Sequence, residues 1–288
     1  MQSLRALMDG PEPVTVPLVL NPLMAKLAEN AGFKALYLGG GASGYMKVHL
    51  EANLTLTEMC QAALDIRTVS ALPLILDGAA GWGDPMHMRR TIGMTEAAGF
   101  AAIEIEDQIL PKRAHHHVGL EHMVPVELMV AKVEEAVAAR RNPETVIVAR
   151  TNGIRASSMD DALRRAEAYR RAGADVLLLS PRTPEEIRHV AERLGGPLMY
   201  LCRPGGVAAS GMTAAELHGL GWRILADPQT VILAMYENAR TIYAEMAAQG
   251  FAVRSRPASD WEKLQHDLHG AIGLDLLLDI EKRTVEKG

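Results

Sequence analysis

Eight short apolar runs, separated by longer amphipathic segments, constrain the fold of this chain more than any other feature of its sequence. The runs are too continuously apolar for a sheet with one solvated face, and they are typical of parallel strands covered on both faces. The predicted strands are PLVLN (17–21), ALYLG (35–39), PLILD (73–77), AIEIE (102–106), VIVAR (146–150), DVLLL (175–179), LMYLC (198–202) and RILAD (223–227).

A weak internal repeat marks the junctions between helices and strands. Its four copies are AGFKALYL (31–38), AGFAAIEI (98–105), AGADVLLL (172–179) and LGWRILAD (220–227). In each copy a glycine can take the left-handed conformation that ends a helix, so that the chain turns directly into the next strand. We therefore predict an α/β fold, a (β/α)8 TIM barrel, with a doubly wound open sheet as the alternative. Eight strands within about 230 residues fit the barrel better.

Segments with helical periodicity lie between the predicted strands. Two examples are VELMVAKVEEAVAARR (126–141) and MDDALRRAEAYRRA (159–172). Ser158 or Asp160 can cap the second helix, and its acidic residues precede its basic ones, as the helix dipole favours.

The end of the chain carries more helix than one barrel needs. Helical segments are predicted at 230–250 and 259–284, and their apolar faces must pack against something. We predict a barrel domain over 1–250 and a helical extension over 251–288, which packs on the barrel or on a neighbouring subunit.

The composition of the chain indicates which kinds of molecule it can bind. A chain of 288 residues, 48% of them hydrophobic, can bury a large core, and a net charge of −5 argues against a nucleic-acid surface. Cys60 and Cys202 lie too far apart in sequence to suggest a disulfide framework, and the sequence has neither a signal-peptide layout nor a membrane-length apolar run. We expect a cytoplasmic protein that binds a small molecule, and neither nucleic acid nor membrane.

Charged residues end three consecutive predicted strands, where the chemistry of a (β/α)8 barrel lies. Asp77 and Glu106 offer hard carboxylate oxygens that suit Mg²⁺. Arg150 offers a planar guanidinium for a substrate carboxylate. The backbone N–H groups of GGGASG (39–44) can cradle an anionic oxygen. Any one of these features is common as plain structure, but together they predict a site.

Several longer stretches resemble one known family. They are LTLTEM (54–59), LILDGAAGWGDP (74–85), AAIEIEDQILPKRAHH (101–116), VPVELMVAKVEEAVAARRNPETVIVARTN (124–152) and RAEAYRRAGAD (165–175). In order along the chain, they are similar to the isocitrate lyase / phosphoenolpyruvate mutase superfamily, and most of all to its short-chain branch of methylisocitrate lyases and related enzymes.

This resemblance implies both an assembly and a chemistry. The implied assembly is a homotetramer of (β/α)8 barrels whose last helix is exchanged between subunits. The implied cofactor is Mg²⁺, with Mn²⁺ as a substitute, which holds a small 2-oxo or 2-hydroxy acid. The implied reaction forms an enolate as a C–C or C–P bond is cleaved or made.

The metal motif of the family is only partly matched. Asp77 stands at its first acid, but Ala79 replaces its second acid. Glu106 keeps the acid of the fourth strand, and Glu51 is matched to an acid that precedes LTLTEM. The resemblance therefore implies that Asp77, Glu106 and Glu51 surround the metal.

The substrate-binding residues are also matched in part. Arg150 keeps the arginine of the fifth strand, with an implied role in both binding and catalysis. The family's Ser-Gly pair reads Gly39-Gly40 here, which keeps the backbone N–H groups and loses a hydroxyl. Tyr37, Gly39, Gly40 and Arg150 are the implied substrate-binding residues.

The loop after the fourth strand departs most from the family. The lyase branch reads Lys-Lys/Arg-Cys-Gly-His there, with the cysteine as the acid–base group. This chain reads KRAHH (112–116), with Ala114 at the cysteine and His115 at the glycine. Because imidazole titrates near neutral pH, we predict His116 or His115 as the general acid, with Lys112 as a further catalytic residue. A solvated loop without chemistry and a transition-metal site are the alternatives.

These observations lead to two hypotheses from different classes. The first is a Mg²⁺-dependent lyase or decarboxylase that cleaves a C–C bond in a small 2-oxo or 2-hydroxy di- or tricarboxylic acid, with 111–121 closing over the substrate as a lid. The second is an altered barrel that binds a metabolite, or that cleaves a C–P or other bond in a related 2-oxo acid. Buried acids at strand ends count against a purely structural barrel, because burying charge is costly.

Overall fold

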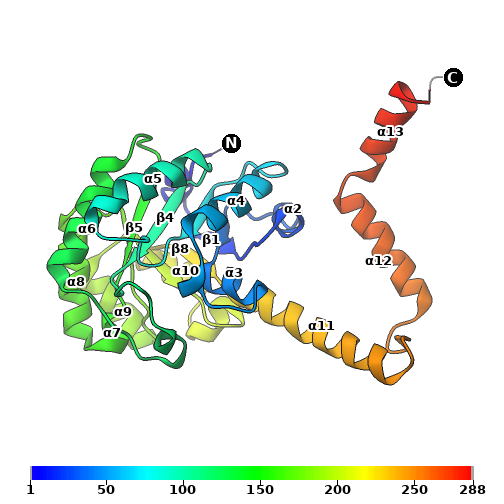
Figure 1. The fold of residues 1–288 in the computed structure, drawn as a ribbon. Helices are drawn as coiled ribbons and strands as arrows, with labels where there is room; N and C mark the ends of the chain where they lie inside the picture. Colours follow the sequence, from blue (N-terminus) through cyan, green and yellow to red (C-terminus); the bar gives the residue numbers. More distant parts are fainter. Residues whose placement is uncertain (1, 287–288) are drawn as a thin grey trace. The chain divides into compact units, whose positions relative to one another are not determined.

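The structure, a computed structural model, describes residues 2–286. Its centre is an eight-stranded parallel sheet in the order β1-β8-β7-β6-β5-β4-β3-β2. A parallel bridge between Leu18 and Tyr37 joins β1 to β2, so that the sheet closes into a barrel surrounded by helices (Figure 1). The predicted (β/α)8 fold is confirmed. The strands are β1 (Val14–Pro17), β2 (Leu36–Leu38), β3 (Leu74–Asp77), β4 (Ala102–Glu106), β5 (Val146–Arg150), β6 (Val176–Leu178), β7 (Leu198–Leu201) and β8 (Trp222–Asp227).

The first strand lies earlier than predicted, and the other seven overlap the predicted ranges closely. The run PLVLN was predicted as a strand over 17–21, whereas β1 ends at Pro17, which pairs with Asp227 of β8. The end of the run instead starts a helix, since the Asn21 side chain accepts a 2.9 Å hydrogen bond from the backbone N–H of Met24.

Helices precede, connect and follow the strands along the chain. They are α1 (Leu4–Met8), α2 (Pro22–Asn30), α3 (Gly40–Met46), α4 (Leu56–Arg67), α5 (Met88–Ala97), α6 (Val126–Ala139), α7 (Gly153–Ala156), α8 (Met159–Arg171), α9 (Pro184–Leu194), α10 (Ala214–Gly219), α11 (Thr230–Ala248), α12 (Ala258–Ala271) and α13 (Leu274–Thr284). Ser158, one of two predicted caps, accepts a hydrogen bond from Asp161 N at the start of α8. The prediction of continuous helix over 259–284 is wrong, because Gly273 takes a left-handed φ of 71° between α12 and α13.

Among residues 2–286, none of the helices combines the length and the apolar character that a membrane span requires.

The four glycines of the internal repeat have the predicted conformation. Gly32, Gly99, Gly173 and Gly221 have φ values of 96°, 82°, 105° and 95°. Each lies between the end of a helix and the start of β2, β4, β6 or β8. A side chain at this φ would strain the backbone, so these junctions depend on glycine.

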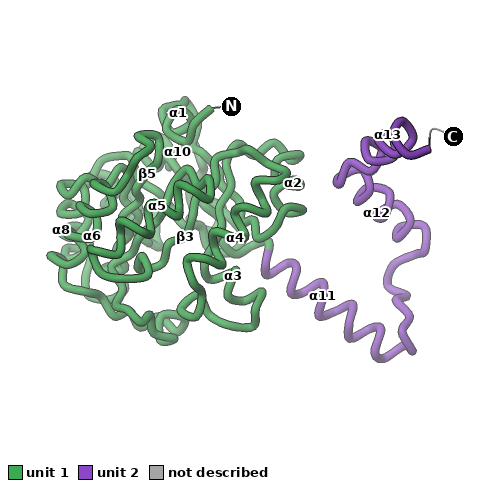
Figure 2. The backbone as a smooth tube through the Cα atoms, turned by 45° about the horizontal axis from the view of Figure 1, so that its top comes forward, with its two compact units in different colours: residues 1–231 green, residues 232–288 purple. Residues whose placement is uncertain are grey.

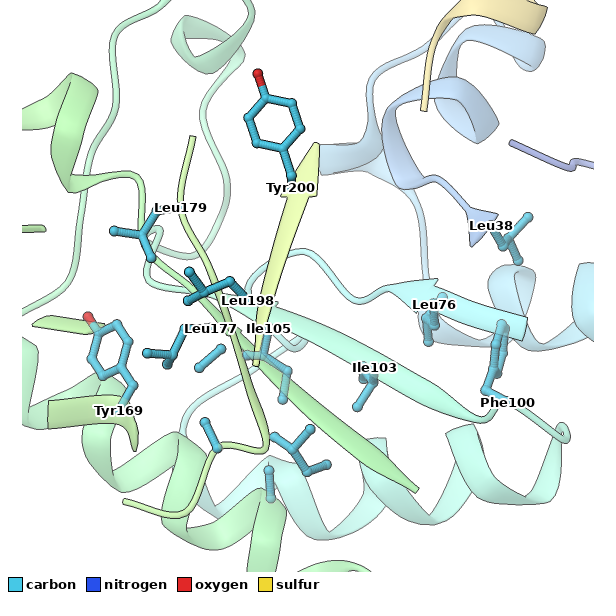
Figure 3. Close-up of a cluster of buried hydrophobic side chains, with 14 of the residues drawn as sticks. Leu38, Leu76, Phe100, Ile103, Ile105, Tyr169, Leu177, Leu179, Leu198 and Tyr200 are labelled. Atoms are coloured by element: carbon cyan, nitrogen blue, oxygen red, sulfur yellow. The ribbon is translucent and has the colours of Figure 1, made fainter. Parts of the chain in front are cut away.

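Side chains alternate between two environments along each strand. On β4, Ile103 and Ile105 face outward and pack under the helices, with Leu76 of β3 beside them (Figure 3). On the same strands, Ile75 and Ala102 belong to a second buried cluster inside the barrel. The alternation carries on to the strand ends, where it turns the last charged residues inward.

The chain divides into two compact units, residues 1–231 and 232–288 (Figure 2). The first contains the whole barrel. In the second, none of the side chains of α12 and α13 is buried.

Candidate functional site

The predicted strand-end residues meet inside the barrel mouth. Asp77, Glu106 and Arg150, the last residues of β3, β4 and β5, are all buried. Glu106 and Arg150 pair in the register of β4 and β5, and Glu106 Oε2 lies 3.4 Å from Arg150 Nε. A cavity of about 130 Å³ opens beside them. Its lining includes Tyr37, Gly39, Gly41, Tyr45, Glu51, Asp77, His116, His117 and Arg150.

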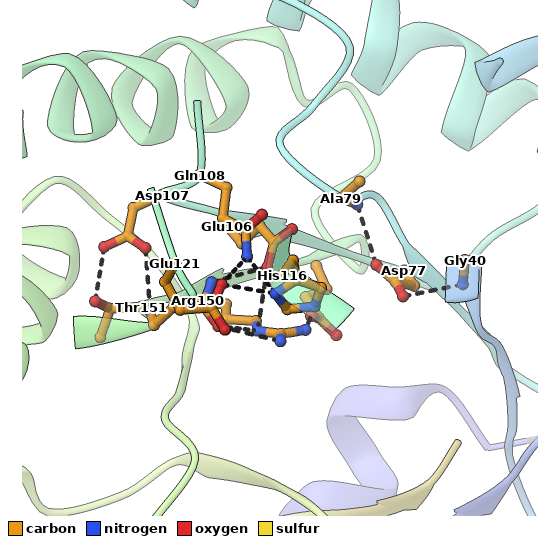
Figure 4. Close-up of polar contacts among 12 residues, drawn as sticks. Gly40, Asp77, Ala79, Glu106, Asp107, Gln108, His116, Glu121, Arg150 and Thr151 are labelled. Atoms are coloured by element: carbon orange, nitrogen blue, oxygen red, sulfur yellow. Dashed lines mark hydrogen bonds and ion pairs between the residues drawn. The ribbon is translucent and has the colours of Figure 1, made fainter. Parts of the chain in front are cut away.

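Asp77 is held by two backbone groups. Its carboxylate oxygens accept hydrogen bonds from Gly40 N at 2.9 Å and Ala79 N at 3.1 Å (Figure 4). Burial, and then the negative charge of Glu51, raise the pKa of Asp77. A Cβ atom on Gly40 would lie 3.2 Å from both Asp77 Oδ2 and Glu51 Oε2. The two carboxylates can therefore lie this close to the backbone because residue 40 has no side chain.

The glycine-rich segment 39–44 has a different structure from the predicted loop cradle. Most of it forms α3, a helix that begins at Gly40. The N–H of Gly40, one of those predicted to bind substrate, donates to Asp77 instead. The segment therefore holds the acid, and Gly39 and Gly41 line the cavity.

Lys112 lies between two of the predicted metal ligands. Its Nζ contacts Glu51 Oε1 and Glu106 Oε1, and only 4% of its side chain is exposed. Burial acts to raise the pKa of Glu106, but the charges of Lys112 and Arg150 outweigh it and lower the pKa to about 2. Glu106 is therefore a permanent carboxylate, and Lys112 is held as an ammonium ion.

Glu104, which was not predicted as a site residue, orients Arg150. Arg150 Nη1 donates to Glu104 Oε1 at 2.7 Å, and the Tyr37 hydroxyl donates to Glu104 Oε2 at 2.9 Å. Arg150 Nε and Nη2 also donate to Asn152 Oδ1. Burial, and then the charge of Asp77, raise the pKa of Glu104 to about 7.

The loop after β4 is closed at its base. Gln108 and Met123 form an antiparallel bridge, and Ile109 N donates to His122 O at 2.9 Å. Within the loop, residues Ala114–Val118 form a short 3-10 helix that carries the three consecutive histidines.

The three histidines face in different directions. His116 Nδ1 lies 2.6 Å from Glu121 Oε2, and its Nε2 lies 3.8 Å from Glu51 Oε1, beside the cavity (Figure 4). His117 also lines the cavity, with Nδ1 3.1 Å from the Tyr45 hydroxyl. His115, in contrast, is absent from the cavity lining, and its ring lies against His122.

Glu121 is a second residue that sequence reasoning missed. Its side chain is fully buried, and its Oε1 lies 3.3 Å from Arg155 Nη1 while Oε2 faces His116. A buried carboxylate against one imidazole nitrogen fixes the orientation of the ring. His116 is thus held with its other nitrogen toward the barrel.

A larger hollow of about 480 Å³ lies at the opposite end of the barrel, around the start of β1. Its charged lining residues are Glu12 and Lys34. It has no convergence of buried charge like that at the strand ends, so we assign the site to the smaller cavity.

The model of the phosphoenolpyruvate phosphomutase family matches residues 4–247. The chain belongs to this family. A 2-methylisocitrate lyase of Aeropyrum pernix is 35% identical over 249 residues, which are 86% of this chain and 80% of that protein. A 2,3-dimethylmalate lyase of Eubacterium barkeri is 35% identical over 80% of each chain.

Solved structures agree with this family assignment. A phosphonopyruvate hydrolase in complex with oxalate and Mg²⁺ superposes with a TM-score of 0.82 at 27% identity, over 98% of both chains. The resemblance seen in the sequence motifs is therefore confirmed, and the relatives of this chain include named carbon–carbon lyases.

The donor atoms of the site fit a hard divalent cation. The carboxylates of Asp77, Glu106 and Glu51 converge around the Lys112 ammonium, and hard oxygen donors suit Mg²⁺. No group of three or more metal-binding side chains is already arranged around a metal position in residues 2–286. The ligand chemistry is present, and Lys112 lies among the ligands.

Proposed function

We propose that this chain is a Mg²⁺-dependent lyase that cleaves a C–C bond in a small 2-oxo or 2-hydroxy di- or tricarboxylic acid. One observation carries the proposal: Asp77, Glu106 and Arg150 are buried together at consecutive strand ends, where Asp77 and Arg150 line a cavity with Glu51. The cavity of about 130 Å³ is several times the roughly 10–15 Å³ that one water molecule needs, so it has room for a small polar ligand. The names of the related lyases support the same class.

In this proposal, Asp77, Glu106 and Glu51 would hold Mg²⁺. When bound, the ion supplies positive charge that stabilises the enolate formed as the bond breaks. The residues of this chain do the rest, and each has a geometry that suits its task.

Arg150 would bind a substrate carboxylate. A guanidinium has five N–H donors, and Arg150 uses one on each nitrogen to contact Glu104 or Asn152. Each terminal nitrogen keeps one N–H, which matches the two oxygens of a carboxylate. Glu104 and Asn152 would keep this fork in a fixed orientation.

His116 would act as the general acid. In this role the protonated Nδ1 would donate to Glu121 Oε2, 2.6 Å away, and Nε2 would face the cavity that the ring lines. After cleavage, the imidazolium would give its Nε2 proton to the enolate carbon, and Glu121 would stabilise the positive charge on the ring until then. Lys112 is a poor base here, because its acidic neighbours favour the ammonium form.

A screen of 2-oxo and 2-hydroxy acids with Mg²⁺ or Mn²⁺ tests the proposal. We expect at least one C–C cleavage, detected as release of pyruvate, another 2-oxo acid or CO₂. Oxalate with Mn²⁺ serves as a binding probe, detected as a rise in the melting temperature of the protein. If this rise is seen but no acid is turned over, the alternative of a barrel that only binds a metabolite is favoured.

Cleavage of a C–P bond is the second candidate. It is favoured by the similarity to a phosphonopyruvate hydrolase over 98% of both chains and by Ala114, where the lyase branch has its cysteine. Release of inorganic phosphate from phosphonopyruvate, without cleavage of any C–C substrate, would establish this function in place of the first.

The partner that we propose for the C-terminal helices is another copy of this chain, in a homotetramer. The exposed apolar side chains of α11, α12 and α13 support this, because a surface of this kind is typical of subunit contacts.

A further inference from the structure

Lys112 has a position that a bound cation would need. Its Nζ bridges Glu51 and Glu106, two of the three carboxylates assigned to Mg²⁺, and it comes from the loop after β4 and not from a strand. We propose that Lys112 is a tethered cation that competes with the divalent ion for these two carboxylates, so that metal binding requires Lys112 to withdraw. This inference rests on the proposed function for its metal.

Lys112 contacts the oxygens that a cation between Glu51 and Glu106 would use. Its Nζ lies against Glu51 Oε1 and Glu106 Oε1, whereas Glu106 Oε2 accepts from Asn152 Nδ2 at 2.9 Å. An ion that binds Glu51 Oε1 and Glu106 Oε1 therefore takes the position of the Lys112 ammonium.

The balance of charge favours the exchange. Asp77, Glu106, Glu51 and Glu104 are four buried carboxyl groups, and Arg150 already pairs with Glu104. Lys112 adds one positive charge among them, whereas a divalent ion in its place adds two. Since uncompensated charge is costly when buried, the ion is the better partner whenever it is abundant, and Lys112 is the better partner when it is scarce.

The test measures Mn²⁺ binding to the full-length protein by electron paramagnetic resonance of the free ion. Lys112→Met keeps the length of the side chain and removes its charge. We expect it to bind Mn²⁺ at least about tenfold more tightly than the wild type, because a buried competing charge is gone. Lys112→Arg keeps the charge, and Arg113→Ala alters an exposed neighbour in the same loop; both should bind as the wild type does.

The outcomes separate this inference from the function on which it rests. Equal or weaker binding by Lys112→Met, while the wild type binds, overturns the competition and leaves the metal assignment intact. Absence of binding in both overturns the metal assignment, and the competition with it. If Lys112→Met does not fold, Lys112→Gln retains a hydrogen-bond donor without the charge, and the same tightening is expected.

Discussion

The barrel and the C-terminal helices differ in the exposure of their apolar side chains. In the barrel, Leu76 and Ile103 are 0% exposed. On α13, Leu276, Leu277 and Leu278 are 62%, 51% and 52% exposed. Burying such a side chain contributes roughly 1.5–3 kcal/mol, so the barrel already has this stabilisation and the helices do not. The apolar side chains of the barrel are therefore already packed within the chain, whereas those of α13 are available for the subunit contact that we propose.

The largest expected effect falls on the chemistry of the barrel. Asp77→Ala or Glu106→Ala should abolish divalent-ion binding, because each removes a carboxylate from the cation position, while the circular dichroism spectrum stays that of the wild type. Asp227→Ala is the matched control. This acid also ends a strand, but it accepts hydrogen bonds from the start of α11. Wild-type Mn²⁺ affinity in both site variants would break the assignment.

The next largest effect falls on assembly. A chain cut after Gly250 loses α12 and α13, and we expect it to lose its oligomeric state or to precipitate, as measured by light scattering on a sizing column. Leu276→Asp should weaken the assembly in the full chain, because it charges an exposed apolar face. Arg283→Ala, at an exposed ion pair with Asp279, is the control that should leave it unchanged. A truncated protein that keeps the oligomeric state of the full chain would contradict this prediction.

The third effect sharpens the comparison within the loop. His116→Asn should lower turnover by roughly 10²–10⁴-fold, the range for one general acid–base group, with a smaller effect on substrate binding. His115→Gly should cost less, since His115 faces His122 and not the cavity. Near-wild-type turnover in a variant that carries both substitutions would show that the histidines belong to a solvated loop without chemistry.

The smallest effect concerns stability and its dependence on pH. Because the pKa of Glu104 is raised from 4.5 to about 7 in the folded chain, its stabilising contribution is full below pH 4.5 and is lost as the pH rises through 7. Between pH 5 and 8 the wild type should lose about 2–3 kcal/mol relative to Glu104→Gln, which cannot ionise. Urea unfolding of both proteins at the two pH values measures this difference. The same pH dependence in both would show that Glu104 is not the group responsible.

The sequence predicted the barrel because its signals are local and repeated. Each strand is an apolar run, and each repeat ends its helix with a glycine such as Gly99. Asp77 and Glu106 could be found because both end strands. Glu104 could have been found as well, since it lies two residues before Glu106 and so faces the same side of β4. The alternation of AIEIE (102–106) carries this signal.

Other features carry no local signal. Glu121 reaches His116 only because the loop folds back on itself, and no periodicity marks such a contact. The helix that begins at Gly40 was hidden by glycines, which disfavour helices on average. There, the hydrogen bond from Gly40 to Asp77 connects residues 37 positions apart in sequence, so it depends on the closed barrel.

The bridge between Gln108 and Met123 has a consequence for how this protein can change. It joins the two ends of the loop, and on either side of it the chain is anchored in β4 and α6. The residues between them can therefore be exchanged as a cassette without altering the pairing of any strand. Replacing this insert would exchange Lys112, His116 and Glu121 together, while Asp77, Glu106 and Arg150 would stay in place because they end strands of the barrel.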